Sequence, residues 1–236
     1  MLEIKNLTKY YGKDFKAVDN LNITVKSGEI YGFIGHNGAG KSTTIKAVVG
    51  IHGFQGGEIL IDGKNVQTEP IEAKKILSYV PDNPDMYEYL TGIQYLNFIC
   101  DIFGVSTADR NEKIKFYADK FSFSNNLGDL ISSYSHGMKQ KLMIISALVH
   151  SPKLMVLDEP FVGLDPISSH NLKVIMREFC DNGGAIFFST HVLEVAEKLC
   201  DRVGIIKDGH LIAEGTMSEI AGDKSLESLF LELANA

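Results

Sequence analysis

The chain has 236 residues, of which 44% are hydrophobic and 22% charged, so it is long enough for one large or two small globular domains. This composition excludes a disordered chain, a collagen and a small disulfide scaffold. The formal net charge of -7 opposes the phosphates of DNA and RNA, so we expect no general nucleic-acid partner. A lysine at a helix N-terminus can still bind one small anion.

The cysteines and the N-terminus indicate the compartment. Cys100, Cys180 and Cys200 are odd in number and too far apart for zinc or redox motifs, so we expect free thiols in a reducing environment. Residues 1–9 lack the apolar region of a secretion signal, and no stretch approaches the roughly 20 apolar residues of a membrane span. We therefore expect a cytosolic chain that itself crosses no bilayer.

The predicted elements begin with two strands and continue with an α/β pattern. Residues 2–11 and 17–25 alternate apolar and polar side chains around a charged turn, which predicts an antiparallel start. Residues 30–34, 154–157 and 185–188 are short apolar runs typical of strands buried on both faces. Helical patterns at 41–49 and 167–179 alternate with them, which predicts a parallel sheet covered by helices.

The middle of the chain and its end have different patterns. Helical spacing predominates at about residues 81–150, with helix starts near Thr91 and between Thr107 and Asp109, and indicates a helical insertion. After it, residues 203–206, a turn at 207–209 and residues 211–212 predict a hairpin, and a final amphipathic helix contains Leu226 and Leu233. We expect one domain: a core of residues 1–80 and 151–210, the insertion, and a C-terminal hairpin and helix at about 203–236.

Residues 35–42 fit the phosphate-binding pattern G-x-x-x-x-G-K-[ST], directly after an apolar strand and before a helical pattern. Backbone N–H groups of such a loop surround phosphate oxygens. Lys41 then reaches the β and γ phosphates, and the Ser42 hydroxyl can ligate Mg²⁺. A chance match in a chain of this length occurs on the order of once in a hundred sequences.

Two carboxylates end the strand at residues 153–157. Asp158 is placed to hold Mg²⁺ directly or through water, and Glu159 to orient or deprotonate an attacking water beside the γ phosphate. Farther upstream, Ser135 opens the helix that leads to this strand, and a serine at a helix N-terminus can bind an anion. On its own, that serine is no more than a good N-cap.

In this order and spacing the three motifs resemble the ATP-binding subunit of ABC transporters over nearly the whole chain. The resemblance implies a P-loop NTPase (RecA-like) α/β core with a parallel sheet, an N-terminal antiparallel β subdomain and an inserted α-helical subdomain. It also implies that ATP and Mg²⁺ are bound, and that ATP is hydrolysed. The implied nucleotide-binding residues are Tyr11, which would stack on adenine, and Gly35, His36, Asn37, Gly38, Ala39, Gly40, Lys41, Ser42 and Thr43.

The resemblance assigns further roles. Residues 134–138 stand at the family signature, normally Leu-Ser-Gly-Gly-Gln, of which Ser135 and Gly137 are retained; these two and His136 would contact the ATP of a partner subunit. Residues 163–165 match the D-loop that communicates across the dimer, with Asp165 as its site residue. The alternative interpretation of Asp165 is a helix-initiating turn before Pro166. His191 stands where the family has its switch histidine, hydrogen-bonded to the γ phosphate, which would make it a catalytic residue.

One departure concerns the metal. The family has a magnesium-ligating glutamine after the strand at residues 77–80, whereas Asp82 occupies that position here. A carboxylate is a harder oxygen donor that can still ligate Mg²⁺, but it lacks the N–H donors of an amide. The implied metal ligands are therefore Ser42, Asp158 and Asp82.

Because the family builds each active site from two subunits, the resemblance implies a head-to-tail dimer that ATP closes and hydrolysis reopens. It also implies transmembrane partner subunits, contacted through the helical insertion and the Asp82 loop, which would hold the chain on the inner face of the cell membrane. Residues 134–140 and 225–233 look most like bacterial ABC-2 type exporters, so we expect export. The alternatives are an ABC importer ATPase, a soluble ABC ATPase of translation or DNA repair, and a P-loop kinase or GTPase.

Overall fold

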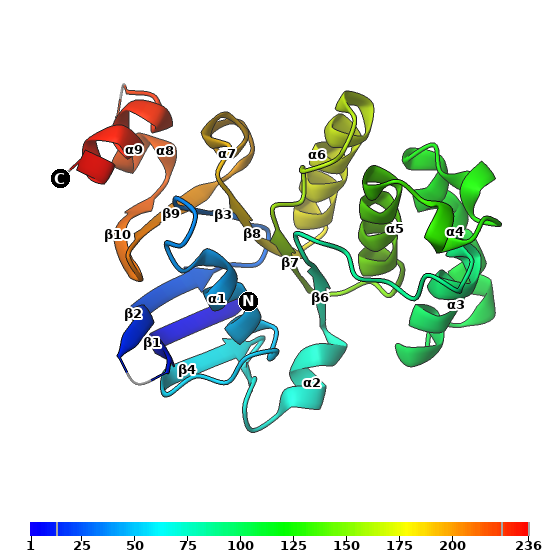
Figure 1. Cartoon of the computed structure of the whole chain (residues 1–236), viewed down its shortest axis with the longest axis horizontal. Helices are drawn as coiled ribbons and strands as arrows, with labels where there is room; N and C mark the ends of the chain where they lie inside the picture. The colour runs from blue at the N-terminus through cyan, green and yellow to red at the C-terminus, as the bar shows by residue number, and fades with distance from the viewer. Residues whose placement is uncertain (13, 223, 236) are drawn as a thin grey trace.

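The computed structural model describes residues 1–12, 14–222 and 224–235 and contains two sheets and a group of helices (Figure 1). The antiparallel sheet has the order β2-β1-β4-β5, formed by β1 (Leu2–Tyr11), β2 (Phe15–Val25), β4 (Gly56–Ile61) and β5 (Lys64–Asn65). Alternating side chains of β1 and β2 are buried in one apolar cluster, as the period of two predicts. The antiparallel start of the chain is thus confirmed.

The six-stranded sheet has the order β10-β9-β3-β8-β7-β6. Its strands are β3 (Ile30–Ile34), β6 (Leu77–Val80), β7 (Leu154–Asp158), β8 (Ala185–Thr190), β9 (Arg202–Lys207) and β10 (His210–Gly215). All neighbours are parallel except β9 and β10, which form the predicted hairpin. Every residue of β3, β7 and β8 is buried, which explains their unbroken apolar sequence.

Helices pack against this sheet. The bounds are α1 (Lys41–Val48), α2 (Pro70–Lys75), α6 (Pro166–Asp181) and α7 (Leu193–Leu199). At the end of the chain, α8 (Met217–Ile220) and α9 (Leu226–Asn235) lie beside the β9–β10 hairpin (Figure 1). The sequence analysis did not predict α2, α7 and α8, because helices of four to seven residues are too short to show a helical period.

The helical insertion stands at the opposite end of the molecule from α9 (Figure 1). It contains α3 (Gly92–Ile102), α4 (Thr107–Lys120) and α5 (His136–Val149), with 3₁₀ turns at Ser124–Asn126 and Ile131–Ser133. Thr91 caps α3 as predicted, and Ser106 caps α4 one residue before the predicted range. Within the described ranges, no helix is both long and apolar enough to span a bilayer.

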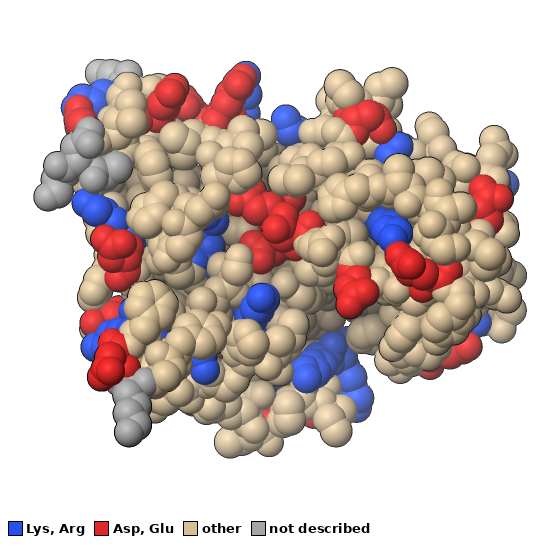
Figure 2. Space-filling model, viewed as in Figure 1, with Lys and Arg blue, Asp and Glu red and all other residues tan. Residues whose placement is uncertain are grey.

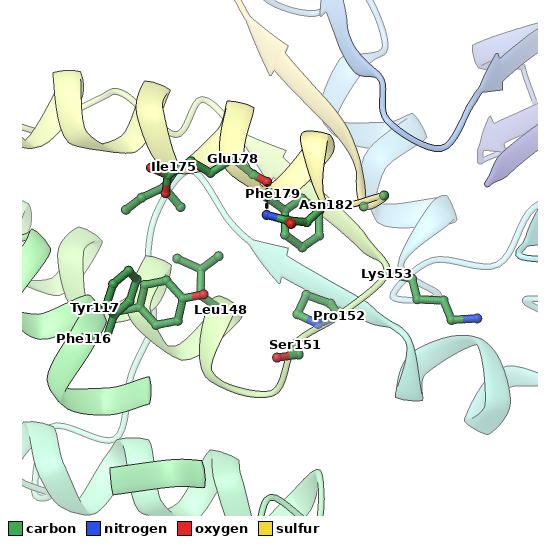
Figure 3. Close-up of a pocket in the computed structure, with 12 residues that line it drawn as sticks. Phe116, Tyr117, Leu148, Ser151, Pro152, Lys153, Ile175, Glu178, Phe179 and Asn182 are labelled. Carbon is green, nitrogen blue, oxygen red and sulfur yellow. Dashed lines mark hydrogen bonds between the residues drawn. The ribbon is translucent and has the colours of Figure 1, made fainter. Parts of the chain in front are cut away.

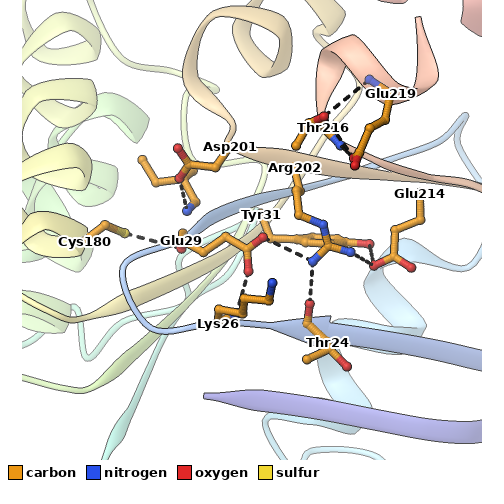
Figure 4. A network of polar contacts seen from close by, with 11 residues as sticks. Thr24, Lys26, Glu29, Tyr31, Cys180, Asp201, Arg202, Glu214, Thr216 and Glu219 are labelled. Carbon is orange, nitrogen blue, oxygen red and sulfur yellow. Dashed lines mark hydrogen bonds and ion pairs between the residues drawn. The ribbon is translucent and has the colours of Figure 1, made fainter.

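A polar network joins the two sheets (Figure 4). The guanidinium of Arg202, at the start of β9, donates to the carboxylates of Glu29 at 3.2 Å and Glu214 at 2.7 Å, and to the Thr24 carbonyl at 3.0 Å. The Tyr31 hydroxyl donates to the same Glu214 carboxylate at 3.1 Å. Burial and the Glu214 carboxylate raise the pKa of Tyr31, which keeps its hydroxyl protonated. Arg202 is therefore the shared partner of two carboxylates, of which Glu29 is buried.

We expect the Arg202→Met variant to lose about 2 to 3 kcal/mol of unfolding free energy, because Glu29 would be left as a buried carboxylate without its cation. Urea unfolding measures this loss. The control is Lys198→Met, which removes an exposed pair with Glu194 and should leave the unfolding free energy close to that of the parent. Equal losses in the two variants would contradict the role given to Arg202.

Candidate functional site

The carboxyl ends of three neighbouring strands bring the predicted motifs together. Strand β8 lies between β3 and β7, with Ile34 paired to Thr190 and Asp158 paired to Ser189. The phosphate loop follows β3, Glu159 follows β7 and His191 follows β8. Because parallel strands end at the same edge of a sheet, segments more than a hundred residues apart in the sequence meet here.

A cavity of about 300 Å³ lies at this edge. It brings together phosphate-loop residues, the two carboxylates after β7, the Asp82 loop and the start of β2. The lining residues are Phe15, Ala17, His36, Asn37, Gly38, Gly40, Lys41, Ser42, Thr43, Asp82, Asp158 and Glu159. The sequence analysis named ten of these twelve; Phe15 and Ala17 are additions from the structure.

The phosphate loop needs glycine at its last turn. Gly40, which precedes α1, has φ of 112°, and a Cβ atom there would approach the Ala17 carbonyl oxygen to 2.7 Å. The loop is also attached to the β9–β10 turn, because the Gly209 N–H donates to the Ala39 carbonyl at 2.9 Å. The N-terminus of α1 faces the cavity, because Lys41, Ser42 and Thr43 line it, and the positive end of a helix dipole favours an anion.

Lys41 occupies the floor of the loop with a side chain that is only 6% exposed. Its ammonium donates to the carbonyl oxygens of Gly35 at 2.6 Å and His36 at 3.3 Å, and lies 4.0 Å from the Glu159 carboxylate. Burial lowers the pKa of Lys41, whereas the nearby carboxylates of Glu159 and Asp158 act in the opposite direction. A phosphate group would supply the negative charge that this partly desolvated ammonium favours.

Asp158, Glu159 and His191 form a connected polar group. The Ser189 hydroxyl donates to Asp158 at 2.5 Å and accepts the Glu159 backbone N–H at 3.1 Å, which ties the ends of β7 and β8 together. The His191 ring Nδ1 lies 2.9 Å from Glu159 Oε1, and its backbone N–H donates to Glu159 Oε2 at 3.3 Å. Both carboxylate oxygens of Glu159 therefore contact His191.

The oxygen donors on the cavity wall fit Mg²⁺. Ser42 supplies a hydroxyl, and Asp158 and Asp82 supply carboxylates. Mg²⁺ is commonly bound through one or two carboxylates, with phosphate oxygens and water completing its shell. The described residues contain no group of three or more His, Cys, Asp or Glu side chains suited to holding a metal by themselves. Acidic side chains also gather at the centre of the face shown in Figure 2.

Two aromatic residues stand at the end of the first hairpin. Tyr11 is not part of the cavity wall; its ring contacts His52 edge-on, with centroids 6.1 Å apart. Phe15, which does line the cavity, is the direct cross-strand partner of Tyr11 and is 63% exposed. Directly opposed residues of antiparallel strands share one face of the sheet. The sequence signal that could have identified Phe15 was this four-residue spacing across the predicted turn.

The signature residues stand apart from the cavity of their own chain. Ser135 caps α5 and accepts the Met138 N–H at 3.3 Å, and none of Ser135, His136 and Gly137 belongs to the cavity wall. His136 and Gly137 pack on the D-loop: a Cβ atom on Gly163 would come within 2.5 Å of the His136 ring, and one on Gly137 within 2.5 Å of the Gly163 carbonyl oxygen. The signature residues of one chain therefore do not share a cavity with the phosphate loop of that chain.

Asp165 of the D-loop caps α6. Its carboxylate accepts the N–H and hydroxyl of Ser168, both at 2.8 Å, and pairs with Lys141 of α5 at 2.7 Å. The Lys141 ammonium and the two Ser168 donors lower the pKa of Asp165 well below its ordinary value. This residue thus links the D-loop to the helix that begins with the signature.

A larger cavity of about 420 Å³ lies elsewhere, between α4, the end of α5 and the end of α6 (Figure 3). Phe116 and Tyr117 form one wall, and Glu178 and Phe179 line it from α6. None of the motif residues lines it. Its size alone therefore does not make it the candidate active site.

Comparison with known proteins identifies relatives over almost the whole chain. Residues 18–162 match the family described as ABC transporter. The chain is 34% identical over 238 residues to the ABC-type transporter ATP-binding protein EcsA of Bacillus subtilis, covering 99% of this chain and 96% of that protein. It is 33% identical over 220 residues to the linearmycin resistance ATP-binding protein LnrL of the same organism, covering 93% and 70%.

A solved structure has the same fold. It is described as an ATP binding subunit of an ABC transporter, and it superposes on this chain with a TM-score of 0.96 at 35% identity. The match covers 99% of both chains. The similarity thus extends beyond the phosphate loop to the helical insertion and to the C-terminal elements.

The cap at Asp165 makes stability depend on pH. We expect Asp165→Ala to lose about 1 kcal/mol of unfolding free energy at pH 7, as for other N-cap residues. Folding lowers the pKa of Asp165. The difference in unfolding free energy between the parent and the variant is therefore complete above the ordinary pKa of 3.8 and shrinks as the pH falls below it. Urea unfolding at pH 7 and pH 3 measures both effects. A difference in unfolding free energy at pH 3 as large as that at pH 7 would contradict the predicted pH dependence.

Proposed function

This chain belongs to the ABC transporter family, and we propose that it is the ATP-hydrolysing subunit of an exporter, driven by the ATP-dependent closure of two such chains. As a member of that family it is an ATP-binding, ATP-hydrolysing subunit of a transporter. The observation that carries the proposal is the meeting of the phosphate loop, the Asp158–Glu159 pair and His191 at one edge of the sheet.

In the proposed nucleotide complex, the ATP phosphates lie on the backbone N–H groups of residues 35–43. The Lys41 ammonium leaves the carbonyl oxygens of Gly35 and His36 and pairs with the β and γ phosphates. Ser42 and Asp158, with Asp82 beside them, hold Mg²⁺, which when bound neutralises phosphate charge. The supporting observation is that these oxygen donors and Lys41 line the same cavity.

Glu159 is the proposed general base for the attacking water. General-base catalysis requires a carboxylate whose direction is fixed, and His191 contacts both oxygens of Glu159. We assign Nδ1 of His191 to Glu159 and Nε2 to the γ phosphate in the nucleotide complex. His191 then orients the base and contacts the transferred group from a single position after β8.

The separation of signature and cavity supports two composite sites. Ser135, His136 and Gly137 would contact the nucleotide held by a second cassette, and the partner's equivalent residues would close the cavity of this chain. The N-terminus of the signature helix, capped by Ser135, carries the positive end of the helix dipole, which suits a γ phosphate. In this proposal the Lys141–Asp165 pair holds the D-loop against the signature helix, so both reach the partner as one unit.

The proposed contact with transmembrane subunits is a groove between α3, α5 and β6. Its cavity of about 290 Å³ is lined mainly by apolar side chains, among them Tyr95 and Ile99 of α3. Burial lowers the pKa of His150 on its wall to about 4, so this imidazole is uncharged at neutral pH. On α3, Phe98 is exposed, and its ring contacts the ring of Tyr87 in the loop that follows Asp82. Exposed apolar clusters of this kind favour a protein partner.

Through these subunits the chain would be held at the inner face of the cell membrane. Export rather than import is supported by the resemblance of residues 134–140 to ABC-2 type exporters and by the relative LnrL, whose description is linearmycin resistance. The importer reading is tested by the direction of transport in inside-out vesicles that contain the chain and its membrane partner. Accumulation that depends on ATP supports export.

The role of Glu159 is tested with Glu159→Gln. We expect ATP turnover to fall by at least about 100-fold, because the amide cannot accept the water proton, while ATP affinity stays within about threefold of the parent. Turnover and equilibrium nucleotide binding measure the two quantities. The contrasting variant is Lys41→Ala, which should lose binding. Parental turnover in Glu159→Gln would remove Glu159 from the mechanism.

The aromatic pair at the hairpin is tested with single alanine variants. We propose that Tyr11 and Phe15 both contact adenine, so each variant should bind ATP roughly tenfold more weakly, as expected for the loss of one stacking contact. Binding of inorganic triphosphate, which has no base, should not change. The control is Phe116→Ala, which lies in the separate cavity of Figure 3. Unaltered ATP affinity in either variant would exclude that ring.

A further inference from the structure

The C-terminal helix α9 packs on the helix that follows His191. Leu226, the first residue of α9, is fully buried in a small apolar cluster with Ala196 of α7 and Ile34 of β3. Leu229, Phe230 and Leu233 cover this cluster from α9. The cluster therefore joins the last helix of the chain to α7 and to the strand residue directly before the phosphate loop.

A hydrogen bond fixes the same contact. The Leu226 backbone N–H donates to the Glu197 carboxylate of α7 at 3.2 Å. At the other end of α9, the Lys207 ammonium donates to the Leu233 carbonyl at 3.2 Å. Helix α9 is thus attached at one end to α7 and at the other to the end of β9.

Helix α7 begins directly after the segment that carries His191. It begins at Leu193, two residues after His191, and none of the side chains that the structure describes caps its N-terminus. The turn between β8 and α7 contains a hydrogen bond in which the Val192 N–H donates to the Thr190 hydroxyl at 3.0 Å. A tilt of α7 would therefore move the His191 ring, whose Nδ1 lies 2.9 Å from Glu159.

Helix α9 has little stability of its own. A helix of ten residues is marginal in water unless it packs on something else. Elements held by few buried contacts are the first to open in a native protein. The docking of α9 is therefore adjustable without unfolding the sheet that carries the nucleotide site.

We propose that α9 positions His191 through α7, so that docking of this C-terminal helix sets the rate of ATP hydrolysis but not the affinity for ATP. Leu226 and Glu197 are the positioning residues. This inference rests on the proposed function, because it requires that His191 acts with Glu159. It makes the C-terminal segment a control element of the catalytic step.

The first test compares two leucines of α9 in the full chain. Leu226→Ala removes the buried contact with α7 and should lower kcat roughly fivefold to tenfold, with KM for ATP within about twofold of the parent. Leu231→Ala changes a side chain that is 55% exposed and should leave both constants unchanged. Glu197→Gln, a milder change on α7, should lower kcat in the same direction, whereas Glu194→Gln, whose partner Lys198 is exposed, should not.

The second test asks whether the effect passes through His191. In a His191→Ala background, Leu226→Ala should change kcat by less than about twofold, because the positioned ring is gone. A merely structural role would lower kcat equally in both backgrounds. Full additivity of the two substitutions would overturn the proposal.

The third test does not depend on turnover. Hydrogen exchange of the α7 amides should rise roughly tenfold in Leu226→Ala and remain at the parental rate in Leu231→Ala. Unchanged exchange in α7 would overturn the inference. A parental turnover in His191→Ala alone would instead count against the role of His191 in the proposed function, so the two failures are distinguishable.

Discussion

The parallel pairing of β3, β8 and β7 is the constraint on which the rest of the structure depends. It places three loops at one edge of the sheet, and the Ser189 hydroxyl then joins the ends of β7 and β8 through Asp158 and the Glu159 backbone. A shift of register by one residue would move the side chains of a strand to the opposite buried face, disrupt the packing on both faces and separate Glu159 from His191. The strength of the core therefore also secures the geometry of the site.

The same fold keeps the phosphate loop and the signature residues apart within one chain. The phosphate loop lies on the core, whereas the signature is carried by α5 and rests on the D-loop. The proposed groove for membrane subunits lies between that insertion and β6, directly before the Asp82 loop. A partner that moves the insertion would therefore also act on a loop that lines the nucleotide cavity. The C-terminal helix packs on α7, the helix that follows His191.

Much of the fold followed from local patterns. The apolar runs predicted β3, β7 and β8, and capping residues such as Thr91 located the insertion helices, because periodicity and caps are encoded in neighbouring residues. Strands β4 and β5 and the short helices were missed, since their few residues show no clear period. Their formation depends on partners such as β1, which are distant in the sequence.

The sequence by itself determined which chemical groups the chain carries and in what order: a phosphate loop with Lys41, two carboxylates after a buried strand, and a histidine after another. Only the tertiary structure decided which of these groups meet. It brought His191 onto Glu159, put Phe15 into the cavity wall and kept Ser135 out of it. The reason is physical: motifs are local, but distances between them depend on strand order, register and packing, to which residues throughout the chain contribute.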